Sequence, residues 1–189
     1  MPIWLIVILG IVALIIVFVW LTYNGLVRLN ERVNEAWSDI TVQLKYRADL
    51  IPNVVETVKG YAKHEKGTFE EVIKARSAAM GAKTVKAAAA AEDQLSGALS
   101  KIFAIAEAYP DLKANENFKE LQIQLQDVED KIQAARRFYN TGAKDLNTKI
   151  KLFPTNLFAN MLGFKIRDYF EVSESEKAKI DNAPSVKFD

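Results

Sequence analysis

The chain of 189 residues contains no cysteine and a single histidine, His64. The lack of cysteine excludes a disulfide framework, thiolate zinc ligands and a cysteine nucleophile. His64 and Glu65 begin like the zinc motif H-E-x-x-H, but Thr68 stands where the second histidine would be. A zinc site would therefore need three or more carboxylates, and we interpret His64 as a surface residue near a helix end. We expect no metal and no cofactor.

Sequence motifs for phosphate binding or nucleophilic catalysis are also missing. The eight glycines are scattered and form no G-x-x-x-x-G-K, G-x-G-x-x-G or G-x-S-x-G pattern. A bundle with two metals would need paired E-x-x-H motifs, which do not occur. The formal net charge is +1, whereas nucleic-acid-binding proteins usually carry a dense basic face. We predict a protein without catalytic residues that binds no nucleic acid.

One long apolar run stands at the start of the chain. Residues 3–21 are nineteen consecutive uncharged residues, and a helix that spans a bilayer needs about 20. A cleaved signal peptide is the alternative, but no Lys or Arg precedes the run, it exceeds the usual apolar core of about 7–15 residues, and no A-x-A-like site follows. Trp4 and Trp20 near the two ends suit the membrane interfaces. We therefore predict an uncleaved anchor whose partner is the lipid bilayer.

Basic residues beside the anchor bear on its orientation. Arg28 and Arg32 follow the apolar run and no basic side chain precedes it, although Glu31 and Glu35 alternate with the two arginines. The excess of Lys and Arg on the cytoplasmic side of membrane helices then places the N-terminus outside the cell membrane and the rest of the chain in the cytoplasm.

The remainder of the chain has helical periodicity and short turns. Apolar residues recur every three or four positions from Leu26 to Ala62 with no linker after the anchor, and Pro52 predicts a kink or, alternatively, a break into two helices. We place a second helix after a capping box at Thr68, a third that stops at Pro110, and a fourth with a clear heptad pattern capped by Asn117 or, alternatively, Asn115.

The prediction is an all-α protein in which an N-terminal transmembrane helix continues into an up-and-down four-helix bundle. The predicted boundaries are 3–21 for the transmembrane helix, 24–153 for the bundle, and 154–189 for a C-terminal segment that packs on the bundle end or the membrane surface and then becomes a polar tail.

Polar residues run along one flank of the predicted fourth helix. They are spaced 7, 4 and 7 positions apart, namely Glu129, Arg136, Asn140 and Asn147. One interpretation is a groove that binds a peptide or a lipid headgroup. The other, which we favour, is that they pair with polar residues of a neighbouring helix, such as Arg47 and Asp49, and fix the register of packing, because partly buried polar groups must be paired.

Basic residues end the predicted fourth helix, and an apolar stretch follows. The basic residues include Lys144, Lys149 and Lys151, and the stretch LFPTNLFANMLGFKIRDYF contains Phe153 and Phe158. In one interpretation the lysines meet headgroups while the apolar residues dip into the bilayer. In the other, the cations suit the helix C-terminus and the apolar residues cap the open end of the bundle.

Several stretches resemble the LemA family. They are YNGLVRLNERVNEAWSDITVQLKYRADLIPNVVETVKGYAKHE, EAYPDLKANENFKELQIQL, EDKIQAARRFYN and FPTNLFANMLGF, and the resemblance runs from about residue 23 to residue 188. It implies a four-helix bundle in a bacterial or archaeal membrane protein with a short N-terminus outside the cell. It supplies no mechanism and no functional residue, although one related branch is associated with magnetosome membranes.

These observations favour a non-enzymatic scaffold or interaction protein at the bacterial membrane, with copies of itself or other membrane proteins as partners. The alternative is an accessory subunit of a membrane enzyme, such as a membrane protease. A third interpretation is a lipid or peptide binder that uses the polar flank of the fourth helix.

Overall fold

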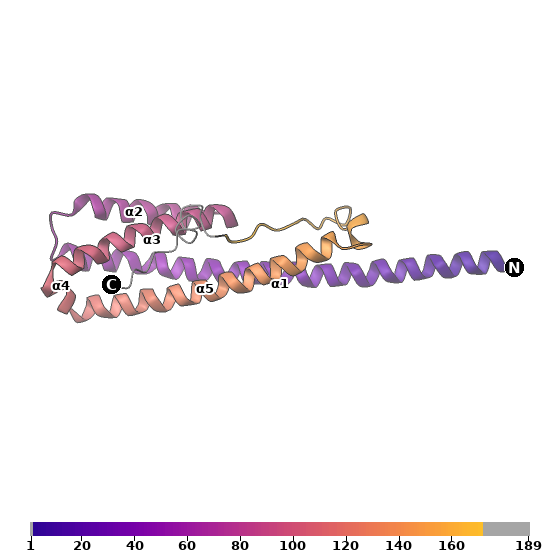
Figure 1. Cartoon of the computed structure of the whole chain (residues 1–189), viewed down its shortest axis with the longest axis horizontal. Coiled ribbons are helices and arrows are strands. Elements are labelled where there is room, and N and C mark those ends of the chain that lie inside the picture. Colours follow the sequence, from indigo (N-terminus) through magenta and orange to yellow (C-terminus); the bar gives the residue numbers. More distant parts are fainter. Residues whose placement is uncertain (1, 172–189) are drawn as a thin grey trace, which may run out of the picture. The chain divides into compact units, whose positions relative to one another are not determined.

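A computed structural model describes residues 2–171, and all the regular structure in that range is helical (Figure 1). The elements are α1 Ile3–Lys59, α2 Lys66–Gly81, α3 Val85–Ala108, α4 Pro110–Ala114, α5 Glu116–Lys151 and the 3-10 helix η1 Thr155–Leu157. The predicted all-α class is confirmed. The polar tail predicted near the C-terminus lies outside the described residues.

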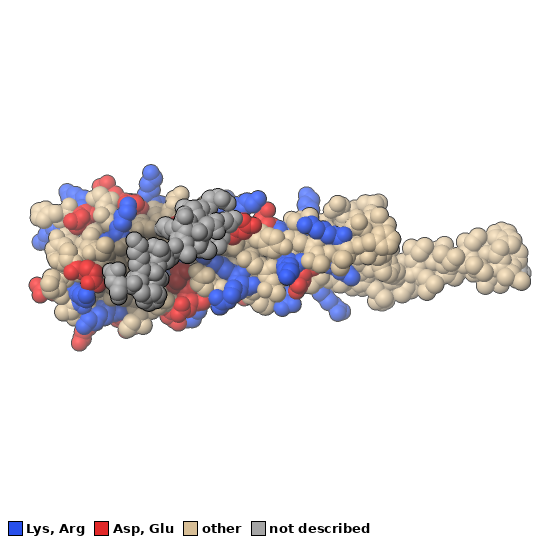
Figure 2. Space-filling view, in the orientation of Figure 1, with Lys and Arg blue, Asp and Glu red and all other residues tan. Residues whose placement is uncertain are grey.

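Helix α1 begins with the apolar run and continues without interruption to Lys59, a total of 57 residues. It is the one helix within residues 2–171 that is long and apolar enough to cross a membrane. Figure 2 shows no charged atoms over residues 3–21 on the face it presents, and nearly all the side chains of this run are exposed. Such a surface is stable in lipid and costly in water, so the predicted single-pass anchor agrees with the structure.

The described part of the chain divides into two compact units. The anchor unit consists of residues 2–38 and Arg137–Asp168, and the bundle unit consists of Asp39–Arg136 and residues 169–171. Both divisions fall inside helices, α1 and α5, so each of these helices contributes to both units. The predicted boundaries at residues 24, 153 and 154 stay a prediction.

The bundle unit contains the four-helix packing. The chain reverses direction after α1, after α2 and again through α4, which gives the up-and-down order predicted (Figure 1). Each helix contributes one apolar stripe to a common core, because residues three and four apart share a helix face. Fully buried core side chains include Ile40, Ile51, Val54, Val72, Leu95, Ile102, Leu112, Phe118, Val128 and Ile132.

Pro52 lies inside α1, which does not break there. A proline has no N–H, so Pro52 leaves the carbonyl of Ala48, four residues earlier, without its helical donor. The Arg76 side chain of α2 replaces that donor: its Nε donates to the Ala48 carbonyl at 2.6 Å. This contact explains how the helix tolerates the proline, since an unpaired, partly buried carbonyl would be destabilising.

This replacement predicts a specific coupling between Pro52 and Arg76. Arg76→Leu is expected to lower the free energy of unfolding by about 1–2 kcal/mol, because the Ala48 carbonyl loses its partner. In a Pro52→Ala background the same change should cost much less, since position 52 then supplies a backbone N–H. Urea unfolding of the full-length protein in mild detergent, followed by circular dichroism, measures this double-mutant cycle. Equal costs in both backgrounds would show that Arg76 acts in some other way.

Two helix starts were predicted from capping residues, at Thr68 and at Asn117 or Asn115, and a third cap, Thr84, was not predicted. The Thr68 cap is wrong: α2 begins at Lys66, and no side chain caps it. Helix α3 is capped by Thr84, whose hydroxyl accepts from the N–H of Ala87 at 3.2 Å. At α5 the alternative holds, because Asn115, not Asn117, accepts from the N–H of Phe118 at 2.9 Å. Pro110 ends α3 as expected and also begins the short helix α4.

The anchor unit is a close pairing of the first part of α1 with the end of α5 and the segment that follows. Its core is formed by Leu26, Val33, Ala36, Tyr139, Ala143, Leu146, Ile150, Ala159 and Phe164. Aromatic rings meet within this unit, among them Trp37 with Tyr139 at 5.9 Å and Tyr23 with Phe164 at 5.8 Å between centroids. The apolar face of α1 is therefore covered by residues that are far away in the sequence.

Candidate functional site

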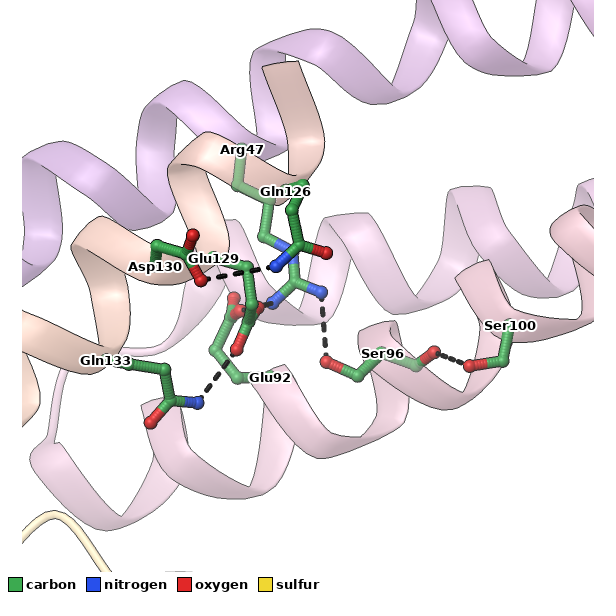
Figure 3. Close-up of polar contacts among 8 residues, drawn as sticks. All are labelled: Arg47, Glu92, Ser96, Ser100, Gln126, Glu129, Asp130 and Gln133. Atoms are coloured by element: carbon green, nitrogen blue, oxygen red, sulfur yellow. Dashed lines mark hydrogen bonds and ion pairs between the residues drawn. The ribbon is translucent and has the colours of Figure 1, made fainter. Parts of the chain in front are cut away.

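A cluster of charged side chains lies inside the bundle unit, with Arg47 of α1 at its centre (Figure 3). The Arg47 guanidinium donates to Glu92 Oε2 at 2.8 Å and to Ser96 Oγ at 3.0 Å, both on α3. It also forms an ion pair with Glu129 of α5, at 2.9 Å between Nη1 and Oε2. One arginine thus connects three helices and is shared by two carboxylates.

The centre of the cluster is buried, the side chain of Glu129 is 30% exposed, and not all polar atoms of the cluster are paired. Arg47 is 6% exposed and Glu92 is 1% exposed. Gln133, one turn along α5, donates to the second oxygen of Glu129 at 2.8 Å and so helps to orient it (Figure 3). Among the described residues, Arg47 Nε and Glu92 Oε1 are buried without a hydrogen-bond partner. Burial of such groups is costly, so the cluster is retained at some expense of stability.

The electrostatics follow from this burial. Burial raises the pKa of Glu92, and the attraction of Arg47 and Arg136 does not cancel this effect, to which the negative charge of Glu129 adds. Burial likewise lowers the pKa of Arg136, against the attraction of Glu129 and Glu92. The Arg136 guanidinium also lies over the ring of Phe170, 4.3 Å from its centroid.

The chemistry open to this cluster is limited by its own cations. Arginine is an obligate cation at physiological pH, so Arg47 occupies carboxylate oxygens of Glu92 and Glu129 that a metal ion would need. Within residues 2–171, no three His, Cys, Asp or Glu side chains could hold a metal together. Charges shared across three helices are the arrangement that the predicted register role would require.

The bundle unit contains four of the residues singled out on the sequence. Arg47, Glu129 and Arg136 lie in or beside the cluster. Asp49 does not join it, because its carboxylate faces solvent and pairs with Lys45 of the same helix at 2.5 Å. Their suggested role in register or interaction stays a prediction.

Sequence reasoning missed the partners on α3. Glu92 lies three residues before Leu95 and seven before Leu99, so it falls on the apolar stripe of its own helix. An acidic residue at a core position of a helical repeat was the available signal, because a buried carboxylate needs a cation. The pattern of α3 alone could not say that the cation would be Arg47.

The other two flank residues, Asn140 and Asn147, lie in the anchor unit. Asn140 is half-buried on α5. Asn147 is 3% exposed and bonds twice to the backbone of Arg167: Nδ2 donates to the carbonyl at 2.9 Å, and Oδ1 accepts from the N–H at 2.8 Å. The Arg167 guanidinium in turn donates to Asn30 and Asn34 of α1, at 2.8 and 2.9 Å. Asn147 therefore fixes the returning C-terminal segment against both helices.

The residues predicted to contact a membrane surface also lie in the anchor unit. Lys144 and Lys151 are exposed near the end of α5, and Lys149 is half-buried. Phe153 is exposed, whereas the half-buried ring of Phe158 packs edge-on against Phe18 of α1, with 6.2 Å between centroids.

The raised pKa of Glu92 predicts a pH dependence of stability. The ordinary pKa of glutamate is about 4.3. Because the pKa of Glu92 is raised in the folded state, Glu92 keeps its proton there above this pH. The contribution of Glu92 to the free energy of unfolding therefore falls as the pH rises through its folded pKa. Glu92→Gln cannot ionise, so its stability relative to the parent should increase as the pH rises from about 4.3 toward neutral. Urea unfolding over this range tests the prediction. Ser96→Ala is the control, because it also removes a hydrogen-bond partner of Arg47 but removes no group that titrates. A constant difference between Glu92→Gln and the parent would contradict it.

Comparison with known sequences gives the relatives of this chain. The sequence model of the LemA family matches residues 36–188. Protein LemA of Metamycoplasma hominis is 30% identical over 164 residues, which cover 85% of this chain and 74% of that protein. Magnetosome protein MamQ 2 of Paramagnetospirillum magneticum and MamQ of Magnetospirillum gryphiswaldense are each 25% identical, over 79% and 78% of this chain. The matched region spans 64% of each MamQ protein, slightly less than two thirds of its length.

Proposed function

We propose that this chain, which belongs to the LemA family, is a non-enzymatic scaffold that holds partner proteins or copies of itself at the bacterial membrane. The observation that carries the proposal is helix α1. One uninterrupted helix supplies both the apolar run of residues 3–21 and a full member of the bundle core, with no linker between them. A protein bound to the bundle is then tethered to the bilayer through a single helical element.

Two further features of the bundle unit support an interaction role. Large apolar side chains remain exposed on three of its helices, namely Val42 on α1, Ile73 and Met80 on α2, and Ile123 on α5. Exposed apolar side chains near the centre of a contact supply much of the binding energy between proteins. The buried charge cluster contributes differently: by fixing helix register, it keeps the outer faces of the helices constant in shape.

The names of the relatives agree with this class of function. The MamQ proteins are named for the magnetosome, a cellular structure, and neither their names nor that of Protein LemA states a reaction.

Site-specific photo-crosslinking of the full-length protein in native membranes tests the scaffold proposal. A photoreactive residue at Val42, Ile73, Met80 or Ile123 is expected to capture the same few proteins, or a second copy, in repeated experiments. Asn53 and Lys74, which are exposed polar positions on α1 and α2, are the matched controls and should capture little. No crosslinks above these controls, together with a monodisperse monomer in mild detergent, would overturn the proposal. Recovery of a membrane protease would favour an accessory role instead.

We further propose that the bundle unit faces the cytoplasm, because Arg28 and Arg32 follow the apolar run. The chain has no cysteine, so Met80→Cys introduces a single exposed thiol in the bundle. A membrane-impermeant maleimide should label it only after the cells are opened. Labelling of intact cells would place the bundle on the opposite side.

A further inference from the structure

The segment after α5 exposes an unusual concentration of large apolar side chains. We call residues 152–164 the apolar loop; it contains no charged residue. Four of its side chains are largely exposed: Leu152 by 53%, Phe153 by 78%, Leu157 by 65% and Met161 by 86%. Exposed apolar clusters of this kind mark a contact with another protein or with a membrane, because their exposure to water is unfavourable.

The position of the loop along α1 identifies the contact. Phe158 packs against Phe18, which lies inside the apolar run, and Phe164 packs against Tyr23, two residues beyond its end at Leu21. With a rise of about 1.5 Å per residue, Phe18 lies roughly 4.5 Å inside the end of the run. The loop therefore lies beside the part of the anchor helix that passes from the lipid interior to the interface.

Most backbone N–H groups of the loop are paired within the chain, which lowers the cost of placing the loop in an apolar medium. Lipid offers no hydrogen-bond partners, so irregular backbone at membrane depth must satisfy its own N–H groups. The N–H groups of Asn156, Leu157, Phe158 and Ala159 all donate to carbonyls within residues 152–155. Those of Leu162, Gly163 and Phe164 donate to carbonyls of residues 158–160. Pro154 has no N–H to satisfy.

Positive charge borders the loop on both sides. Lys149 and Lys151 precede it, and Lys165 follows directly. Lysines beside a membrane-inserted apolar segment can reach the headgroups of anionic lipids. The loop is also held in place, because Asn147 bonds to the backbone of Arg167 and the Tyr139 hydroxyl donates to the carbonyl of Asp168 at 2.9 Å.

We propose that the apolar loop is a second membrane-contact element, inserted into the leaflet in which residues 3–21 end. Phe153, Leu157 and Met161 contact acyl chains, while Thr155 and Ala159, which are buried, hold the loop on the anchor unit. The neighbouring lysines lie at the headgroups. The bilayer is the occupant of this surface because the surface is continuous with the membrane-spanning run of α1.

Fluorescence quenching by lipids carrying a spin label tests the proposal on the full-length protein in nanodiscs. The absence of native cysteine allows single environment-sensitive probes at Phe153→Cys, Met161→Cys and, as a lipid-exposed reference, Leu21→Cys. Met80→Cys is the matched control, since Met80 is also an exposed apolar residue but lies in the bundle unit. Probes at 153 and 161 should show blue-shifted emission and lose intensity with labelled lipid as the reference does, whereas the control should not.

Two results would overturn the proposal. If an aqueous quencher such as iodide acts on positions 153 and 161 and labelled lipid does not, the loop lies in water. If the emission is blue-shifted but neither quencher acts, a protein surface covers the loop. If this protection appears only in nanodiscs that contain two copies of the chain, the covering surface is a second copy. Replacement of the anionic lipid phosphatidylglycerol by phosphatidylcholine separately tests whether the lysines bind anionic headgroups. Quenching by labelled lipid should become weaker only if they do.

Discussion

Arg47→Met is expected to lower the free energy of unfolding by about 3–5 kcal/mol at neutral pH, the largest effect that the structure predicts for a single polar residue. Removal of the guanidinium leaves Glu92 and Glu129 close together, and Glu92 buried, without the cation that they share. Loss of one partner of a buried ion pair is strongly destabilising because the remaining charge stays out of water. Urea unfolding of the full-length protein in mild detergent measures the loss.

A second change separates this cause from a simple loss of packing. Arg47→Met combined with Glu92→Met removes both of the most buried charges and should recover most of the stability, since apolar residues of similar size often replace buried ion pairs without loss. Lys45→Met is the control. Lys45 lies on α1 like Arg47 and also forms an ion pair, with Asp49, but this pair is exposed to solvent. If the double variant is as unstable as the sum of its single variants, the cluster is not held together by charge.

The second large effect is expected at Asn147, in the anchor unit. Asn147→Leu removes two hydrogen bonds to the backbone of Arg167 and leaves that N–H and carbonyl without their partner, at a cost of about 2–4 kcal/mol in stability. The loss should be local to the returning segment. Hydrogen exchange of the peptide that covers residues 164–170 should accelerate, while exchange in α2 and α3 changes little.

A neighbouring asparagine provides the control for this prediction. Asn34 also bonds to Arg167, but it is exposed and meets only the guanidinium, so Asn34→Ala should have a small effect on both stability and exchange. Equal effects of the two variants would show that the guanidinium, not the pairing of Asn147 with the backbone, holds the segment. In the nanodisc experiment, Asn147→Leu should also make the quenching of a probe at Met161 less complete.

Several features could be predicted from the sequence because they depend on consecutive residues. The anchor follows from nineteen uncharged residues in a row, and the helices follow from apolar spacings of three and four. Membership of the LemA family was likewise readable from long stretches of sequence. Capping was less secure: Asn115 and Asn117 both fit the pattern, and Thr68 fitted a capping box, because several nearby polar residues can satisfy the same local rule.

The pairing of residues across helices was decided by the tertiary structure alone. The sequence placed Glu129 and Arg136 on one flank of α5 and offered Arg47 as a partner. The apolar stripe of α3 pointed to a buried Glu92, but the identity of its cation and the exclusion of Asp49 depended on the packing. The donor that Pro52 lacks comes from Arg76, 28 residues away from the carbonyl that it serves. The sequence also left open whether the apolar residues after α5 cap the bundle or contact a membrane, and the tertiary structure leaves Phe153 and Met161 exposed.

The physical reason is that two kinds of interaction set these features. Helix formation and membrane insertion depend on short-range terms, which are nearly fixed by the residues within a few turns. Which side chain meets Arg47 depends on the rotation and axial shift of three helices, and these follow from all of their packing contacts together. The sequence by itself therefore determined where this chain forms helices and where it enters the membrane, and only the packing of those helices decided which charges they bury and which apolar residues they leave exposed.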